Sequence, residues 1–332
     1  MDVSVDDVIT VRGLVKRYGA IEAVKGIDLD VHRGEIFGFL GPNGAGKSTT
    51  ISVLCTLVEA TGGSAVVAGC DVARQPQQVR ARIGLVFQDP SLDNQLTARQ
   101  NLYFHAMAYG VPRRERHERI RTAFEMVGLS DRADATVITY SGGMKRRLEI
   151  ARGVLHYPEV LFLDEPTIGL DPQTRAKVWD HLREVRERTG TTIFMTTHYM
   201  EEAEWCDRIA IIDHGRIVAL GTPDELKDQV GGDVVVVTTS DNSRAAAQIS
   251  ERLGATPVAD DGTLRIDVPD GPEFVPRLVK SLDVEVRTVT VRRPSLDDVF
   301  LHLTGRAIRD DEVDSGAALR QMMARRWQGA RR

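Results

Sequence analysis

The chain carries at residues 41–49 the run Gly41-Pro42-Asn43-Gly44-Ala45-Gly46-Lys47-Ser48-Thr49, which fits the pattern G-x-x-x-x-G-K-[ST] of a phosphate-binding loop. The apolar run 36–40 before it predicts a buried strand. Residues 48–57 after it contain neither Pro nor Gly and predict a helix. This pattern indicates phosphate binding only between a strand and a helix, which is the context here. The alternative is a glycine-rich turn that merely carries Lys-Ser.

The loop's composition suits an anion. Glycines let several backbone N–H groups point into one concavity, and the start of a helix adds partial positive charge there. We expect Lys47 to reach the β- and γ-phosphates of a nucleotide, and the Ser48 hydroxyl to bind Mg²⁺. All nine residues of the run are therefore candidates for nucleotide binding.

The composition is that of a soluble globular protein. The 332 residues suffice for one large and one smaller domain, and 42% are hydrophobic and 27% charged. A net charge of −5 gives no indication of nucleic-acid binding. No stretch is long and apolar enough to span a membrane, and the first residues lack the layout of a signal peptide. The three cysteines have no metal-ligand or redox spacing, which predicts reduced thiols in the cytosol.

Patterning predicts an α/β domain over residues 5–230. Two antiparallel strands are expected within residues 8–31, broken at Gly19, and helices dominate residues 97–157. In that helical insert, Thr97 and Gln100 predict a capping box, and Pro112 predicts the start of the next helix. Further strands are predicted at 65–69, 83–87, 160–163, 191–196, 208–213 and 216–220, and helices at 77–82, 172–188, 199–205 and 222–230.

A second domain is predicted over residues 233–304, after Gly231-Gly232. Its order of strand, helix, strand, helix, strand fits a small α+β domain of ferredoxin-like kind. Residues 305–332 turn polar and charged, which predicts a disordered tail. Within that tail, apolar residues at helical spacing among arginines, over residues 318–327, leave open an alternative contact with an anionic membrane surface.

An acidic pair follows the most apolar strand. Residues 160–163 are uninterruptedly apolar and end in Asp164-Glu165. Because such a strand is central in a parallel sheet, its end lies where ligands bind. In phosphoryl transfer, Asp164 would support Mg²⁺ and Glu165 would act as general base on the attacking water. The alternative is an exposed acidic turn.

Further motifs resemble those of ATP-binding-cassette (ABC) ATPases. Ser141-Gly142-Gly143 is similar to the family's signature motif and Gln88 to its Q-loop. Gly169-Leu170-Asp171 resembles its D-loop, His198 its switch histidine, and Tyr18 the aromatic residue that stacks on adenine. The motifs occur in the family's order over about residues 5–225. Tyr140 and Met144 replace the usual Leu and Gln around the signature core, and Ile168-Gly169 stands where Ser-Ala is commoner.

The resemblance implies a RecA-like core with an antiparallel β subdomain and a helical subdomain. It also implies a head-to-tail homodimer, in which each ATP lies between one phosphate loop and the other subunit's signature motif. The candidate catalytic residues are Lys47, Gln88, Glu165 and His198. Candidate nucleotide contacts outside the loop are Tyr18, Ser141, Gly142, Gly143 and Asp171, and candidate Mg²⁺ ligands are Ser48, Gln88 and Asp164.

The C-terminal segment narrows the resemblance. The segment looks like the ending of ATP-binding subunits of daunorubicin/doxorubicin-resistance exporters. It consists of residues 292–301, Arg-Arg-Pro-Ser-Leu-Asp-Asp-Val-Phe-Leu, followed by Thr304-Gly305-Arg306. This implies a separate integral membrane permease and a peripheral place on the cytoplasmic face of the membrane. A soluble ABC-class ATPase acting on nucleic acid or ribosomes is the alternative, but the chain carries one cassette, a short helical insert and no cysteine pairs. An importer ATPase would predict a different C-terminal segment.

Overall fold

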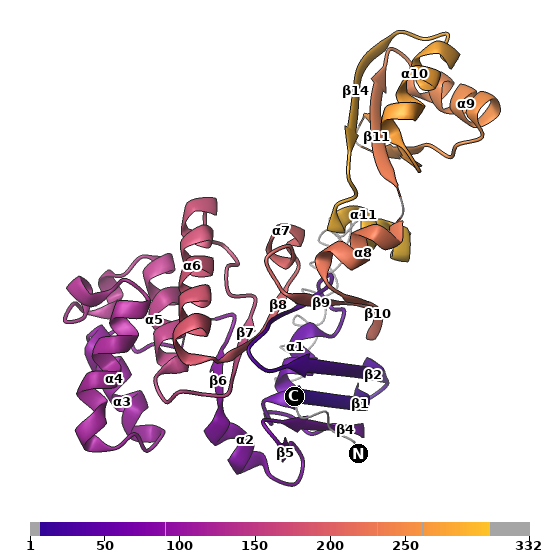
Figure 1. Cartoon of the computed structure of the whole chain (residues 1–332). Helices are drawn as coiled ribbons and strands as arrows, with labels where there is room; N and C mark the ends of the chain where they lie inside the picture. Colours follow the sequence, from indigo (N-terminus) through magenta and orange to yellow (C-terminus); the bar gives the residue numbers. More distant parts are fainter. Residues whose placement is uncertain (1–6, 90, 231, 261, 306–332) are drawn as a thin grey trace, which may run out of the picture. The chain divides into compact units, whose positions relative to one another are not determined.

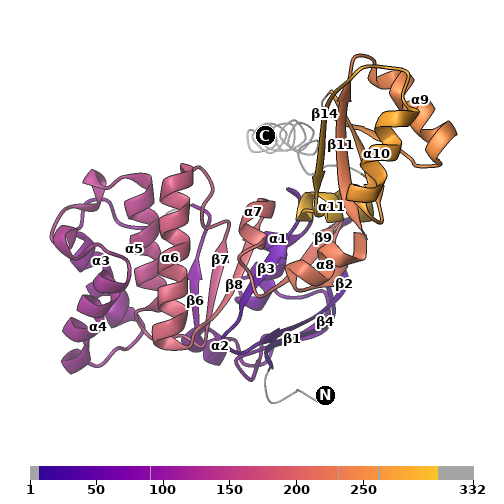
Figure 2. The ribbon, with the colours of Figure 1, turned by 45° about the horizontal axis from the view of Figure 1, so that its top comes forward.

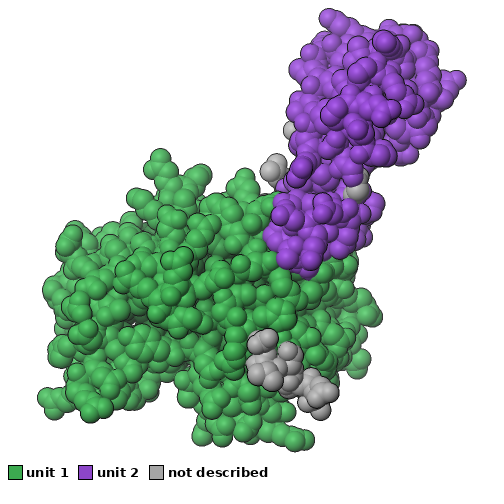
Figure 3. All heavy atoms as spheres, viewed as in Figure 1, with its two compact units in different colours: residues 1–220, 311–332 green, residues 221–310 purple. Residues whose placement is uncertain are grey.

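The computed structural model describes residues 7–89, 91–230, 232–260 and 262–305. Apart from Gly305, the predicted disordered tail and its membrane-facing alternative lie outside the described residues. Two compact units are present, and among described residues they divide at Gly221 (Figure 3). The predicted division at residue 230 lies farther along the chain. The helix between these positions groups with the second unit because it packs against that unit's last helix.

The first unit contains two sheets. One is antiparallel, in the order β2-β1-β4-β5, and joins β1 (Asp7–Tyr18), β2 (Ile21–His32), β4 (Gly62–Val67) and β5 (Cys70–Asp71). Its β1–β2 hairpin is the predicted antiparallel pair, with Tyr18 opposite Ile21 at the turn.

The second sheet has the order β10-β9-β3-β8-β7-β6. It joins β3 (Ile36–Leu40), β6 (Ile83–Val86), β7 (Val160–Asp164), β8 (Thr192–Thr197), β9 (Arg208–Asp213) and β10 (Arg216–Gly221). The pairs β9–β3, β3–β8, β8–β7 and β7–β6 are parallel, so their carboxyl ends share one edge.

One apolar core cluster joins the two sheets, with aromatic rings of the parallel sheet at its centre. The rings of Phe37, Phe39 and Phe162 lie 5.4–5.6 Å from that of Phe194, and this group packs with the apolar residues of β1 and β2 in one core cluster. Stacked and tilted aromatic contacts at such distances stabilise a core beyond their buried area. This packing fixes the central strands β3, β7 and β8, and so the positions of the loops at their carboxyl ends.

Helices complete the first unit, with α1 (Lys47–Leu54), α2 (Pro76–Arg82), α3 (Ala98–Ala108), α4 (Arg113–Met126), α5 (Gly142–Val154), α6 (Pro172–Thr189) and α7 (Met200–Ala203). Helices α3, α4, α5 and α6 pack together beside the parallel sheet (Figures 1 and 2). The predicted Thr97–Gln100 capping box begins α3, and Pro112 is the N-cap of α4. Helix α1 ends before the predicted residue 57, because the chain turns at Thr56 with a φ of 60°.

The second unit is a sheet in the order β12-β13-β11-β14 with every pair antiparallel. Its elements are α8 (Pro223–Val230), β11 (Asp233–Thr239), α9 (Asn242–Leu253), β12 (Val258–Asp260), β13 (Thr263–Val268), α10 (Gly271–Ser281), β14 (Val286–Arg292) and α11 (Leu296–Thr304). This is the ferredoxin-like order that we expected, completed by the short strand β12, which patterning missed. Helices α9 and α10 cover one face of the sheet, with Val235, Ile249 and Leu278 in the core. No helix in the described segments is long and apolar enough to cross a bilayer.

Candidate functional site

The predicted chemistry gathers at the carboxyl ends of three neighbouring strands. Strand β3 leads into the phosphate loop, β7 ends at Asp164 and is followed by Glu165, and β8 ends at Thr197 and is followed by His198. Because β8 lies between β3 and β7, it contacts both: the Gly41 N–H donates to the Thr197 carbonyl at 3.2 Å, and Thr196 bonds Asp164. Ligands bind at this edge in open parallel sheets.

Main-chain atoms of neighbouring strands pack closely against the phosphate loop. A Cβ on Gly46, where φ is 112°, would lie 2.7 Å from the Ala23 carbonyl oxygen of β2. A Cβ on Gly41 would lie 2.2 Å from the Ile212 carbonyl oxygen of β9. The Gly215 N–H also donates to the Ala45 carbonyl oxygen at 2.9 Å. Only glycine therefore fits at positions 41 and 46.

Lys47 occupies the loop's interior and is 4% exposed. Its Nζ donates to the Gly41 and Pro42 carbonyl oxygens at 2.6 and 3.0 Å and lies 3.3 Å from Glu165 Oε1. Burial lowers the pKa of Lys47, an effect that the negative charge of Glu165 partly offsets. The ammonium is thus desolvated and held by groups that a phosphate is able to replace.

Glu165 is also buried, at 7% exposure, and its backbone has a φ of 46°. This left-handed conformation costs a non-glycine residue about 1–3 kcal/mol and clusters at functional sites. Burial raises the pKa of Glu165, but the hydrogen bond from His198 and the charge of Lys47 outweigh it and leave the pKa lowered. His198 Nδ1 lies 3.4 Å from Glu165 Oε1. Glu165 is therefore an ionised carboxylate at neutral pH, in the form that accepts a proton.

Oxygen ligands for Mg²⁺ come from two elements. The Ser48 hydroxyl at the start of α1 donates to Asp164 Oδ1 at 3.1 Å. A hydroxyl and a carboxylate oxygen are the hard donors that Mg²⁺ prefers, and it usually completes its shell with phosphate oxygens and water. No group of three or more His, Cys, Asp or Glu side chains suited to a metal occurs in the described ranges. The donor set therefore fits a metal that arrives with a nucleotide.

Arg146 of α5 is a site residue that sequence reasoning missed. Its guanidinium is 6% exposed and donates to the carbonyl oxygens of Asp164 and Pro166, on either side of Glu165, at 3.0 and 2.5 Å. It also donates to the Phe87 carbonyl oxygen, one residue before Gln88, and pairs with buried Glu149. Arg146 thus links the helix of the predicted signature motif to the loops that carry Gln88 and Glu165.

The signature segment forms the expected helix start. Ser141 is the N-cap of α5, and its hydroxyl accepts from the Met144 N–H. A Cβ on Gly143 would lie 2.3 Å from Thr174 Cγ2 of α6, whereas nothing lies within 4 Å of one on Gly142. Asp171 is the N-cap of α6, and its carboxylate accepts from the Thr174 N–H at 3.0 Å. Asp171 therefore has a structural role within this subunit.

The predicted residues divide into two sets. Lys47, Ser48, Asp164, Glu165 and His198 are brought together. Tyr18, Gln88 and the signature residues lie on other elements: Tyr18, at the end of β1, is 47% exposed with Lys16 Nζ 4.8 Å from its ring centroid, and Gln88 is exposed after β6.

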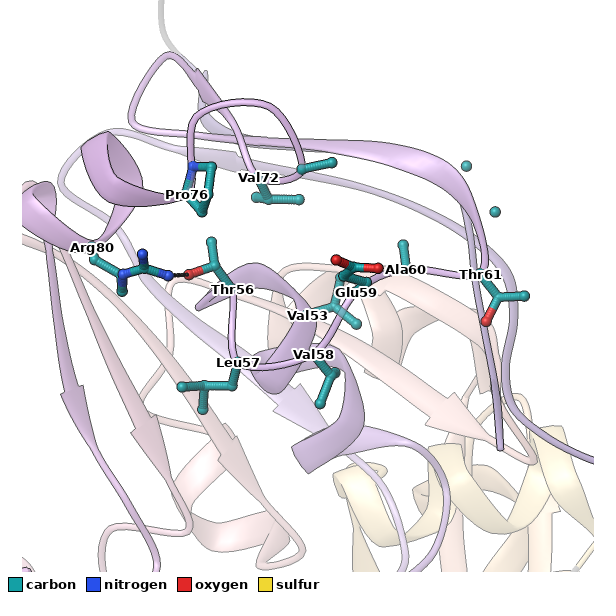
Figure 4. Close-up of a pocket in the computed structure, with 13 residues that line it drawn as sticks. Val53, Thr56, Leu57, Val58, Glu59, Ala60, Thr61, Val72, Pro76 and Arg80 are labelled. Carbon is teal, nitrogen blue, oxygen red and sulfur yellow. Dashed lines mark hydrogen bonds between the residues drawn. The ribbon is translucent and has the colours of Figure 1, made fainter. Parts of the chain in front are cut away.

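A pocket of about 540 Å³ lies at the other end of α1 (Figure 4). It is lined by residues of the α1–β4 loop and of α2, and Arg80 donates to the Thr56 hydroxyl across it at 2.9 Å. None of the predicted site residues lines it. Helix α1 separates this pocket from the phosphate loop.

Comparisons with known proteins identify the family of the chain. The ABC transporter family matches residues 24–168, and the C-terminal domain of DrrA1-3-like ATP-binding proteins matches residues 221–304. The chain is 45% identical over 306 residues to the daunorubicin resistance ATP-binding protein DrrA3 of Streptomyces coeruleorubidus, covering 90% of this chain and 96% of the relative. It is 39% identical to the Nod factor export ATP-binding protein I of Ralstonia nicotianae, covering 91% and 95%.

A solved structure of a dimeric bacterial ABC transporter cassette is similar as well, with a TM-score of 0.59 and 27% identity over 64% of this chain and 98% of the other. One of the two matched families lies in each unit of the chain. The chain belongs to the ATP-binding proteins of ABC transporters, in the group that carries the DrrA-type C-terminal domain.

Proposed function

We propose that this chain hydrolyses ATP as a homodimer and thereby drives export of a drug-like or lipid-like compound through a separate integral membrane permease. The observation that carries the proposal is the convergence of Lys47, Ser48 and Glu165 at one edge of the parallel sheet, within 3.3 Å for the Lys47–Glu165 pair. A phosphate cradle, a metal site and a base are the parts that phosphoryl transfer to water requires.

Each side chain has a role that its surroundings support. Lys47 binds the β- and γ-phosphates, exchanging its contact with Glu165 for one with the nucleotide. Glu165, ionised and held by His198, accepts the proton of the attacking water, and His198 keeps the carboxylate oriented. Ser48 and Asp164, with Gln88, would hold Mg²⁺, which neutralises the phosphate charge when bound.

The second set of residues suits a composite site. The N–H groups at the start of α5, where Gly142 has open space beside it, would bind the γ-phosphate of the ATP held by the partner subunit. Tyr18 would stack on adenine, and Asp171, fixed as the cap of α6, would lie at the subunit interface. The resemblance to a dimeric cassette supports this arrangement.

The exporter role rests on the relatives and the C-terminal unit. The curated relatives that are 39–45% identical over about nine-tenths of the chain are named for drug resistance or for Nod factor export. We place the chain on the cytoplasmic face of the membrane, bound to its permease. Action on nucleic acid or ribosomes is disfavoured by the net charge of −5, because such binding relies on neutralising phosphates.

The test uses a tagged Glu165→Gln chain in its native cells, with ATP–Mg²⁺ added to the membranes before purification. We expect turnover to fall about 10²–10⁴-fold while ATP binding persists, so the closed complex is trapped. A multi-span membrane protein should then co-purify in equal amount, and a Lys47→Ala chain, which cannot bind ATP, should retain less of it. Recovery of ribosomes or DNA in place of a membrane protein would overturn the exporter role.

A further inference from the structure

The backbone of the proposed base is held by a side chain from the next strand. Glu165 has a φ of 46°, in a region that a non-glycine residue keeps only where its surroundings fix it. Its N–H donates to Thr196 Oγ1 of β8 at 3.0 Å, inside the protein. The Thr196 hydroxyl therefore fixes the peptide that leads into the strained residue.

The same hydroxyl orients the proposed metal ligand. Thr196 Oγ1 donates to Asp164 Oδ1 at 2.6 Å, and Asp164 and Thr196 face each other in the register of β7 and β8. Thr196 is 0% exposed, so water does not take its place. One hydroxyl thus accepts a hydrogen bond from the backbone of Glu165 and donates one to the carboxylate of Asp164, so it is used both as an acceptor and as a donor.

We propose that Thr196 is a positioning residue for ATP hydrolysis, whose single hydroxyl sets the Asp164 carboxylate toward Mg²⁺ and the Glu165 carboxylate toward the attacking water. This rests on the proposed function of the site. Thr196 itself does not touch the nucleotide; it acts through its two neighbours. Because both contacts come from one atom, its loss displaces the metal ligand and the base together.

The substitution Thr196→Val keeps the shape of the side chain and removes the hydroxyl. We expect kcat to fall about 10- to 100-fold, the effect of small misplacements of catalytic groups. The Mg²⁺ concentration for half-maximal rate should rise, because Asp164 loses a partner that orients it. ATP affinity in EDTA should stay unchanged, because Lys47 and the loop N–H groups are not bonded to Thr196. Thr196→Ser, which restores the hydroxyl, should recover kcat to within about threefold.

The chain offers a matched control on the same strand. Thr192 is 1% exposed, and its hydroxyl accepts from the Gly34 N–H at 2.9 Å, at the opposite end of β8. Thr192→Val therefore also removes a buried hydroxyl that accepts a backbone N–H, but away from Asp164 and Glu165. We expect it to leave kcat within about twofold of the wild type, whatever it costs in stability.

The experiment compares the full-length wild type with the variants Thr196→Val, Thr196→Ser, Thr192→Val and Glu165→Gln. For each, thermal unfolding confirms the fold, steady-state assays give kcat, KM for ATP and the Mg²⁺ dependence, and titration with mant-ATP gives affinity in EDTA and in Mg²⁺. Where the turnover of the isolated chain is below detection, the gain in mant-ATP affinity on adding Mg²⁺ is the measurement that tests the role of Thr196. This gain should be lost in Thr196→Val and kept in Thr196→Ser and Thr192→Val.

The outcomes separate this inference from the function on which it rests. If the wild type hydrolyses ATP detectably but no faster than Glu165→Gln, or if it gains no mant-ATP affinity on adding Mg²⁺, the proposed hydrolysis site fails. If the wild type is faster than Glu165→Gln but Thr196→Val matches the wild type in kcat and in Mg²⁺ dependence, only the role of Thr196 is overturned. An equal loss in Thr192→Val, or no recovery in Thr196→Ser, would likewise reduce Thr196 to a structural residue.

Discussion

Glu165→Gln should change the stability of the nucleotide-free protein as well as its turnover. The carboxylate lies 3.3 Å from Lys47 Nζ, and both side chains are at most 8% exposed. At an effective dielectric constant of about 20, two unit charges at that distance attract by about 5 kcal/mol. Removing one partner of a buried pair costs about 3–5 kcal/mol, because the other charge is left without compensation. Lys47 keeps two carbonyl oxygens, so we expect the lower end, about 3 kcal/mol.

A nucleotide should reverse this loss. In the wild type the phosphates must displace Glu165 from Lys47, whereas in the variant they meet an uncompensated ammonium. We therefore expect the variant to bind the non-hydrolysable analogue AMP-PNP about tenfold more tightly, which adds about 1.4 kcal/mol of ligand-induced stabilisation. For a unit of this size, 1 kcal/mol corresponds to about 2–4 °C in Tm.

The assay is thermal unfolding followed by tryptophan fluorescence, with and without AMP-PNP and Mg²⁺. Without ligand, Glu165→Gln should melt about 6–12 °C below the wild type, and its ligand-induced shift should be larger by about 3–6 °C. Glu149→Gln is the matched control, since Glu149 is buried against Arg146 at 3.3 Å but does not touch Lys47. It should lower Tm without enlarging the ligand shift. A Glu165→Gln protein that melts like the wild type and shows the same ligand shift would refute the reasoning.

Three further outcomes are expected. Lys47→Ala should abolish the AMP-PNP shift in Tm, because the loop loses its buried cation; a shift of wild-type size would exclude Lys47 from phosphate binding. Arg146→Met should lower the free energy of unfolding in urea by about 3–5 kcal/mol, because three carbonyl oxygens lose a donor and buried Glu149 loses one of its two arginine partners; a loss below about 1 kcal/mol would contradict this. His105→Phe should reduce acid destabilisation. Burial and the charge of Arg152 lower the pKa of His105 to about 3, so the unfolded chain takes up the proton first, and stability is lost as pH falls from about 6.5 toward 3. At pH 5 this amounts to about 2 kcal/mol, which urea unfolding at pH 7 and 5 should find missing in the variant.

Local patterns account for most of what could be predicted. The strand, glycine loop and helix at residues 36–54 and the capping box at Thr97 depend on neighbours in sequence, and the structure has both. Strand β12 was missed because its three residues, Val258–Asp260, are too few to show an alternating pattern. Helix α11 was not predicted as a helix, although Ser295 and Asp298 form a capping box at its start. Its packing against α8 is a tertiary contact that local sequence patterns do not show. This contact places the boundary between the units at Gly221.

The residues of the site likewise divide into those that local sequence patterns predict and those that depend on tertiary packing. Asp164, Glu165 and His198 are visible because each closes a strand or matches a motif. Thr196 and Arg146 are not, because the first depends on the register of β8 against β7 and the second on how α5 packs over two loops. One signal was present for Thr196: it ends the strand predicted over residues 191–196, at the edge where ligands bind in parallel sheets. The left-handed backbone of Glu165 has no signal in sequence, since its residue type does not favour that conformation.

The carbonyl oxygens beneath the phosphate loop also set how this protein is able to evolve. A crowded side chain is often rescued by a smaller neighbour, but the atoms that face Gly41 and Gly46 belong to the main chain of Ile212 and Ala23, which every residue type carries. No second substitution opens room there without moving a strand. A substitution at either position therefore cannot be compensated by a second substitution nearby, whatever compound is transported. Other positions of the loop are less constrained, since nothing lies within 4 Å of a Cβ built on Gly44.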